Sequence, residues 1–373
     1  MGKAHSHAYH DIPLFFPDIA TPVKQVICGR DAVGLKAARL QFGWKHAETD
    51  WRRVLERDDV DAIDISAPTN VHKEIVMATC AKGKDLFCEK PLALSLSDAR
   101  NMLQAARTAG IRHMVGFNYR FAPAVQLAKK LIDEGRVGKI YHFRGFFLQD
   151  WIIDPDFPLV WRLQKDIAGS GSHGDLGAHV IDLAHYLVGG LAEVIGMSET
   201  FVKQRPLPSE MTGLSGKGDA DGPKAPVTVD DATLFLAKFE NGALGSFEVS
   251  RFAPGHRCTN SFEINGSLGS IRFDFERVNE LEVYFTNDAS DVQGFRRILA
   301  TDSAHAYSTH WWPPGHTLGY EHTFIHEMVE WLMAMKEDRQ PVPNFEDGVK
   351  CQQVLEAVDI SIERRQWVRV SDV

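Results

Sequence analysis

Apolar and polar residues alternate with two periods in the first third of the chain. Short apolar runs, typical of buried strands, are separated by longer segments whose apolar residues recur every three or four positions, as in amphipathic helices. The expected strands and helices are residues 23–28, 62–66, 85–89 and 113–117, and residues 31–42, 51–57, 72–82 and 97–109, respectively. This order predicts a parallel sheet with helices on both faces, which binds ligands beyond the carboxyl ends of its strands.

The first strand of such a sheet is absent from this pattern. Residues 1–9 have the composition of a helix start, and Gly2 corresponds to the last glycine of the G-x-G-x-x-G fingerprint that links a first strand to its helix. We expect about 10–15 residues upstream of Met1 to supply the strand and the other glycines.

Beyond residue 120 the pattern changes to longer alternating segments, typical of strands with one buried face. They are residues 140–148, 232–240, 243–251, 260–265, 270–275 and 280–285. Asn241-Gly242 and Asn265-Gly266 are hairpin signals, so we expect an α+β domain with a large, mostly antiparallel open sheet. Two amphipathic helices, residues 323–336 and 348–365, follow. The expected division of the chain is residues 1–120, 121–345 and a C-terminal helix and tail, 346–373.

Residues 202–229 interrupt this pattern. They are rich in Pro, Gly, Ser and Asp and have little to bury. We expect a surface excursion that is mobile or contacts another subunit.

Composition narrows the possible functions. Lys+Arg 41 against Asp+Glu 50 give a net charge of −9, and no basic cluster offers a phosphate-binding surface, so nucleic acid is not expected as a partner. No apolar run approaches the roughly 20 residues of a membrane helix, and the start does not resemble a secretory signal. We therefore expect a cytoplasmic protein that does not bind membranes.

Cysteines and clustered histidines do not indicate a metal site. The 5 cysteines are scattered, so neither a disulfide framework nor a cysteine zinc site is expected. His5, His7 and His10 have no acidic or cysteine partner at metal-ligand spacing, and we expect them to be solvated or close to a phosphate. His322 and His326 lack the H-E-x-x-H order of zinc proteases, so no metal is expected there either.

A glycine-rich stretch, residues 169–182, leads into a predicted helix that carries an acid and an imidazole. From Asp175 onward apolar residues repeat at helical spacing, and Asp175 and His179 fall together on the neighbouring stripe. Side chains four apart on a helix have Cβ atoms about 5–6 Å apart, so these two can grip one small molecule. The alternative is an ordinary first-turn aspartate and a core histidine.

Polar residues also follow the predicted parallel strands, where ligands bind. They are Pro68, Asn70, Glu89, Lys90 and Asn118. Lys90 is the chemically interesting member, because an ammonium group at a site mouth donates a hydrogen bond to a substrate hydroxyl and eases removal of its proton. The alternative is a surface Lys-Pro turn.

Three motifs in order carry a resemblance to a known family. They are Glu89-Lys-Pro-Leu92, Gly116-Phe-Asn-Tyr-Arg120 and the loop with Asp175-x-Gly177-x-His179. Together they resemble the Gfo/Idh/MocA oxidoreductases, the glucose–fructose oxidoreductase and inositol dehydrogenase type. Residues 148–151 and 159–162 are most similar to its levoglucosan dehydrogenase-like sugar dehydrogenases. The resemblance implies a Rossmann domain for NAD or NADP and a second domain whose open sheet forms homo-oligomer contacts, in a dimer or tetramer.

The resemblance also implies site residues. The catalytic residues would be Lys90, Asp175 and His179, with His179 as the general base. The expected substrate-binding residues, for several of which a structural role stays open, are Tyr119, Gln149, Trp151, Arg162, Asp175 and His179. The expected cofactor-binding residues are Gly2, Lys3, Arg30, Pro68, Asn70, His72, Glu89, Lys90 and Asn118.

These expectations define an NAD(P)-dependent dehydrogenase that oxidises a secondary hydroxyl of a sugar, anhydrosugar or cyclitol to a ketone. Gly29-Arg30 stands where NAD-specific domains usually carry an acid for the adenine ribose, so NAD and NADP both stay open, with a slight preference for NAD. The rival is a non-catalytic sugar or nucleotide sensor on the same fold. The combination of Lys90, Asp175 and His179 disfavours it, because a sensor needs no base.

Overall fold

The computed structural model describes residues 1–212, 215–219 and 221–373, and the chain divides into two compact units. The first contains residues 1–122 and 307–349, and the second residues 123–306 and 350–373. Residues 307–345, which the sequence pattern assigns to the second domain, thus belong to the first unit. Within the described ranges, no helix has both the length and the apolar character needed to cross a membrane.

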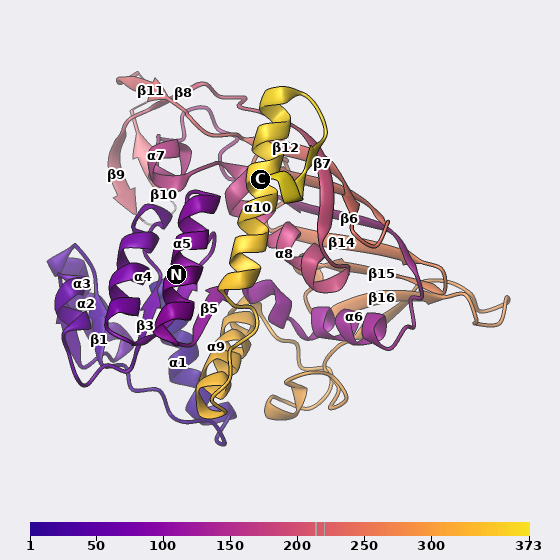
Figure 1. Ribbon diagram of the computed structural model, residues 1–373, viewed down its shortest axis with the longest axis horizontal. Helices are drawn as coiled ribbons and strands as arrows, with labels where there is room; N and C mark the ends of the chain where they lie inside the picture. The colour runs from indigo at the N-terminus through magenta and orange to yellow at the C-terminus, as the bar shows by residue number, and fades with distance from the viewer. Residues whose placement is uncertain (213–214, 220) are drawn as a thin grey trace. The chain divides into compact units, whose positions relative to one another are not determined.

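The first unit contains five parallel strands in two sheets (Figure 1). They are β1 (Val26–Cys28), β2 (His46–Glu48), β3 (Ala62–Ile65), β4 (Asp85–Glu89) and β5 (His113–Gly116). β1 pairs with β2, and β4 lies between β3 and β5. The alternation of strands and helices was predicted from the sequence, except for β2, a three-residue strand without a buried residue.

Helices accompany these strands, and some of them begin at a side-chain cap. They are α1 (Gly2–Phe15), α2 (Ala32–Phe42), α3 (Trp51–Leu55), α4 (His72–Ala81), α5 (Leu96–Ala109) and α9 (Tyr320–Lys336). At α5, Ser95 Oγ accepts the Asp98 N–H at 3.2 Å, and Gly110 ends the helix with φ 67°, a conformation that glycine adopts without strain. The caps explain why the predicted and observed limits of α5 agree closely.

Helix α1 is joined by side chains to strands of both parallel sheets. Trp44, two residues before β2, donates its indole N–H to Ser6 Oγ at 2.9 Å, and the Tyr9 hydroxyl donates to Asp64 of β3 at 3.0 Å. Its apolar face packs with α9 in a core that includes Ile12 and Met328. The two sheets are therefore linked through α1, although β1 and β3 do not pair.

The second unit is built on a sheet of nine strands (Figure 1). They are β6 (Ile140–Leu148), β7 (Leu191–Glu199), β12 (Ala232–Phe239), β13 (Leu244–Ser250), β14 (Thr259–Gly266), β15 (Gly269–Asp274), β16 (Glu280–Phe285), β17 (Arg296–Leu299) and β18 (Val368–Arg369). Their order is β17-β16-β15-β14-β6-β13-β12-β7-β18, and of the described pairs β6 and β13 run parallel while the others are antiparallel. This confirms the expected α/β fold with a mostly antiparallel second sheet.

Helices of the second unit cover one face of this sheet. They are α6 (Pro123–Asp133), α8 (Ala178–Leu187) and the part of α10 (Phe345–Arg364) that lies beyond residue 349, whereas the short helix α7 (Lys165–Ala168) packs against residues 161–163. Gly145 of β6 allows α8 to approach closely, because a Cβ atom at this position would stand 2.5 Å from Val180 Cγ1. The height of α8 above the sheet thus depends on the absence of a side chain.

Residues 202–229 form short strands where the structure describes them. β8 (Gln204–Pro206) pairs with β11 (Lys224–Pro226), and β9 (Pro208–Thr212) pairs with β10 (Ser215–Gly218). Arg205 of β8 is completely buried and donates to the carbonyl oxygens of Asp154 and Ile152, at 2.7 and 2.5 Å. The buried guanidinium of Arg205 therefore attaches this segment, which was expected to have little to bury, to the backbone of residues 152–154.

Candidate functional site

Most of the predicted cofactor-binding residues lie at the carboxyl ends of the parallel strands. Arg30 is exposed two residues after β1, and Asn70 is exposed in the loop after β3 together with half-buried Pro68. Glu89 ends β4 and Lys90 follows it. Asn118, two residues after β5, is buried and donates to Thr323 Oγ1 at 2.8 Å. The parallel topology thus gathers these residues at one edge of the first unit.

The amino end of α1 suits the phosphates of a dinucleotide. Gly2 and Lys3 form its first turn, which contains no acidic residue and no side-chain cap. A Cβ atom at Gly2 would contact Ser66 Oγ at 3.5 Å, so the helix start lies directly beside the end of β3. Free backbone N–H groups and the positive end of the helix dipole favour an anion such as a pyrophosphate here.

His72 has a ring engaged with the backbone on both sides. Its Nε2 lies 2.9 Å from the Ala67 carbonyl oxygen and its Nδ1 lies 3.2 Å from the Leu92 carbonyl oxygen. Burial lowers the pKa of His72, against the opposing effect of these carbonyl groups. The ring therefore connects the loop after β3 to the turn after β4, and a direct role in cofactor binding stays a prediction.

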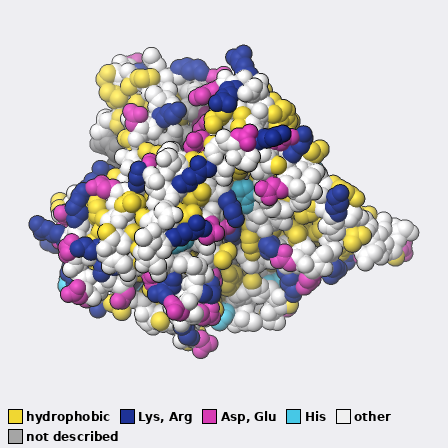
Figure 2. Space-filling model, in the orientation of Figure 1, with side chains coloured by type: hydrophobic (Ala, Val, Ile, Leu, Met, Phe, Trp, Pro, Cys, Tyr) yellow, Lys and Arg dark blue, Asp and Glu magenta, His cyan; other side chains and the backbone are white. Residues whose placement is uncertain are grey.

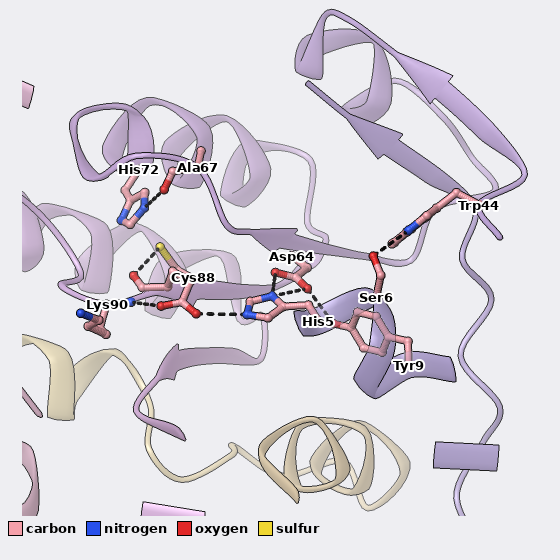
Figure 3. Close-up of polar contacts among 10 residues, drawn as sticks. His5, Ser6, Tyr9, Trp44, Asp64, Ala67, His72, Cys88 and Lys90 are labelled. Carbon is pink, nitrogen blue, oxygen red and sulfur yellow. Dashed lines mark hydrogen bonds and ion pairs between the residues drawn. The ribbon is translucent and has the colours of Figure 1, made fainter. Parts of the chain in front are cut away.

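His5 lies in a buried polar network beneath the same edge (Figure 3). Its Nδ1 is 2.9 Å from both carboxylate oxygens of Asp64, and its Nε2 is 3.0 Å from Glu89 Oε1. The side chain is only 2% exposed, so the expectation that His5 is solvated is wrong, whereas its proximity to a phosphate stays a prediction. Asp64 and Glu89 are 59 and 84 positions away from His5 in the sequence, which is why its pairing with β3 and β4 was not predicted.

The His5 ring is protonated in this environment. Burial by itself lowers the pKa of His5, but the charges and hydrogen bonds of Asp64 and Glu89 outweigh burial and raise the pKa to about 10. Tyr9, which also contacts Asp64, has its pKa raised by burial and by that carboxylate. One imidazolium thus faces two acidic side chains in an apolar surrounding.

In the second unit, the predicted active-site helix begins with a wide turn. Residues His173–Gly177 form a π-helical turn that continues directly into α8, so the helical backbone starts two residues earlier than expected. Asp175 lies within the wide turn, and buried His179 is the second residue of α8, with its ring centroid 6.0 Å from that of Phe147. Single π-turns are common where a helix is adapted to a functional site.

Asp230 caps this turn from a distant part of the chain. Its carboxylate accepts the backbone N–H groups of Gly171 and His173, both at 2.8 Å, and the Ser172 hydroxyl at 2.5 Å. A Cβ atom at Gly171 would stand 1.7 Å from the Asp230 carbonyl oxygen, so only glycine fits there. The electrostatic interaction with His173, together with these hydrogen bonds, outweighs the effect of burial and lowers the pKa of Asp230. No pattern in the sequence indicates this role of Asp230, which is 59 positions from Gly171.

Arg251 is a second residue that the sequence did not reveal. Its guanidinium, which is 1% exposed, donates to Asp175 Oδ2 at 2.7 Å and lies 5.5 Å from the centre of the Trp151 ring. Arg162 is close to the same pair, because its carbonyl oxygen accepts a hydrogen bond from the Arg251 guanidinium at 3.4 Å. Burial lowers the pKa of Arg162, and the charge of Asp175 opposes that effect. Asp175 is therefore held by a buried cation, which orients its carboxylate.

The other predicted substrate residues have defined partners. Gln149 Oε1 accepts the Trp151 indole N–H at 3.0 Å, next to the Arg251 guanidinium that faces the same indole. Tyr119 belongs to the first unit, where it is buried and its ring centroid lies 6.5 Å from that of Tyr320. The structure brings together Gln149, Trp151, Arg162 and Asp175 in the second unit, and Lys90, Asn118 and Tyr119 belong to the first.

The histidines of α9 have structural partners. His326 is completely buried, accepts the Trp311 indole N–H at 2.8 Å and donates to the Phe121 carbonyl oxygen at 3.0 Å. Burial lowers the pKa of His326 to about 3, so the ring is neutral. Among the residues that the structure describes, no group of three or more His, Cys, Asp or Glu is arranged to hold a metal ion.

The charges on the visible surface are mixed. Figure 2 shows Lys and Arg side chains interspersed with Asp and Glu on this face. Such a mixture differs from the continuous basic stripe of a nucleic-acid-binding surface.

Family comparisons fit this geometry. Residues 2–117 match a model of an oxidoreductase family with an NAD-binding Rossmann fold, and residues 125–272 match a model of the GFO/IDH/MocA C-terminal domain. The chain is also 42% identical to levoglucosan dehydrogenase of Pseudarthrobacter phenanthrenivorans, over 100% of this chain and 96% of the relative. The chain belongs to the Gfo/Idh/MocA family. It is thus an oxidoreductase with a nicotinamide dinucleotide cofactor, as the motifs indicated.

Solved structures of Gfo/Idh/MocA-like proteins agree. An oxidoreductase domain protein from Kribbella flavida is 50% identical, with a TM-score of 0.94, over 99% of this chain and 96% of that one. Levoglucosan dehydrogenase in complex with NADH and levoglucosan is 41% identical, with a TM-score of 0.93 and the same coverage. The expected similarity to levoglucosan dehydrogenase-like enzymes is therefore confirmed.

The His5 network predicts a pH dependence of stability. The pKa of His5 is raised on folding from 6.5 to about 10, so its contribution is complete below pH 6.5 and is lost as the pH rises through about 10. The facing groups are Asp64, Glu89 and Tyr9, with Glu327 near Tyr9. When the free energy of unfolding is measured with urea at pH 6.5, 8 and 9.5, the difference between the wild-type protein and His5→Gln should become smaller at each higher pH. A constant difference across this range would show that His5 is not charged in the folded protein.

Proposed function

We propose that this oxidoreductase oxidises a secondary hydroxyl group of a sugar or anhydrosugar to a ketone, with NAD preferred over NADP. The observation that carries the proposal is the full-length similarity to levoglucosan dehydrogenase, which has been solved with NADH and levoglucosan. The ion pair of Asp175 with buried Arg251, beside the helix of His179, supports it, because a fixed carboxylate is suited to hold sugar hydroxyls.

In this proposal each chain residue has one task. His179 accepts the proton of the reacting hydroxyl, because an imidazole titrates near neutral pH. Lys90 donates a hydrogen bond to the same oxygen and stabilises its developing negative charge. Asp175 accepts a hydrogen bond from a second hydroxyl, and Gln149 and Trp151 bind other parts of the ring. The bound nicotinamide supplies the acceptor for the hydride.

The residues of the first unit support a dinucleotide cofactor. The start of α1 offers free N–H groups, and Gly29 after β1 has room for a ligand, because a Cβ atom there would meet only Leu35, at 3.4 Å. Arg30 beside it is exposed and can contact adenine or a ribose phosphate.

A substrate panel tests the proposed function. Levoglucosan, common monosaccharides and inositols are incubated with the enzyme and with NAD or NADP, and the absorbance of the reduced nicotinamide is followed. We expect the highest kcat/KM with an anhydrosugar and NAD. Reduction of neither cofactor with any of these polyols would contradict the proposal.

His179→Ala tests the assignment of the base. We expect kcat to fall by about two to four orders of magnitude, the usual contribution of a general base, while NADH binding measured by fluorescence stays intact. His256→Ala, which removes a half-buried histidine three residues before β14, is the matched control and should retain turnover. Near-normal turnover of the His179 variant would rule out this role.

We further propose that the chain forms homo-oligomers through the face of the nine-stranded sheet opposite its helices. Met197, Leu234 and Leu236 are exposed there along a groove of about 760 Å³. Arg144, Glu263 and Arg272 form a ladder of both charge signs on neighbouring strands, which a second copy related by a two-fold axis can complement.

Light scattering tests this interface. Leu236→Glu places a charge in the groove and should reduce the oligomer mass, whereas Leu40→Glu, at an exposed leucine of α2, should not. A monomeric wild-type protein, or an unchanged mass of the Leu236 variant, would refute the interface.

A further inference from the structure

A buried histidine of α1 reaches the backbone of Lys90 in two steps (Figure 3). His5 Nε2 lies 3.0 Å from Glu89 Oε1, and Glu89 Oε2 accepts the backbone N–H of Lys90 at 3.1 Å. At the other side of the ring, Nδ1 lies 2.9 Å from both oxygens of Asp64. Since both ring nitrogens face carboxylates, the ring donates twice, which only the protonated imidazolium can do.

The surroundings leave the Glu89 carboxylate little space. It lies against Gly116 of β5, where a Cβ atom would stand 3.2 Å from Glu89 Cδ and 3.3 Å from Oε2. The His5 ring is enclosed by Phe87 and Phe324, with ring centroids 5.4 and 5.9 Å away. The apolar walls exclude water, so the hydrogen bonds of the network are strong and directional.

We propose that His5 is a positioning residue for Lys90: through Glu89 it fixes the turn after β4 and thereby the origin and direction of the lysine side chain. The inference rests on the proposed role of Lys90 in turnover. A group that is displaced by about 1 Å from its reacting partner loses up to about 100-fold in rate, so an effect through the backbone is measurable.

A purely structural role for the same network gives a different result. Both roles predict a less stable His5→Gln protein, because removing one member of a buried charge cluster is destabilising. Only the positioning role predicts a slower enzyme among the molecules that are folded. The decisive quantity is therefore kcat at a temperature where circular dichroism shows complete folding.

The experiment measures His5→Gln, Glu89→Gln and the variant that carries both of these changes. Tyr9→Phe is measured beside them. Tyr9 lies one turn later on α1 and donates to Asp64, which faces the opposite nitrogen of the His5 ring from Glu89, so its variant is the matched control. We expect His5→Gln and Glu89→Gln each to lower kcat by about 10- to 100-fold, and His5→Gln to leave the NADH affinity and the substrate KM nearly unchanged. The double variant should be no slower than the slower single variant, because both changes break one chain of contacts. Tyr9→Phe should lose stability and keep its kcat.

Lys90→Met separates failure of the inference from failure of the proposed function. If Lys90→Met is nearly inactive while folded His5→Gln turns over at the wild-type rate, His5 has only a structural role and the inference is wrong. If Lys90→Met itself keeps its turnover, the proposed role of Lys90 is wrong and the inference falls with it. If His5→Gln does not fold, Glu89→Gln decides, since wild-type turnover of that variant would equally overturn the inference.

Discussion

The ion pairs of His5 with Asp64 of β3 and Glu89 of β4 join the amino-terminal helix of the first unit to its parallel strands. β1 and β3 do not pair, so the side chains of α1 provide a connection that backbone hydrogen bonds do not. A buried cluster of one cation and two anions is costly to desolvate and is a poor source of stability compared with apolar packing. Its value lies in orientation, because it gives the end of β4 a single arrangement.

In the second unit, the π-turn before α8 is held in place by other contacts. Asp230 supplies the hydrogen-bond acceptors that the start of the π-turn lacks locally, and buried Arg251 holds Asp175. Both come from the chain around β12 and β13, far from the helix in sequence. In each unit, therefore, a residue with a proposed catalytic role is positioned by contacts from a distant part of the chain: Lys90 through Glu89 and His5, and Asp175 through Arg251.

Much of the fold was predictable because it is encoded in local periodicity. The alternation of buried runs and amphipathic segments gave the strands and helices of the first unit, and Asn-Gly turns gave the hairpins of the second. Short elements with exposed residues, such as β2, carry no such signal. Lys90, Asp175 and His179 are predicted site residues because they stand in motifs that resemble those of the family. His5, Asp230 and Arg251 were not predicted, because their partners are 58 to 84 positions away in the chain and charge alone does not specify a partner.

Two glycines near the helix of His179 cannot be replaced by larger residues without displacing their neighbours. Gly145 lies under α8 and Gly171 lies against the Asp230 carbonyl, and neither position has room for even a methyl group. Libraries designed to change substrate specificity should therefore leave both positions constant and vary Gln149, Trp151 and Arg162, the proposed substrate-binding residues. The helix that carries His179 would then keep its place while the surface presented to a sugar is altered.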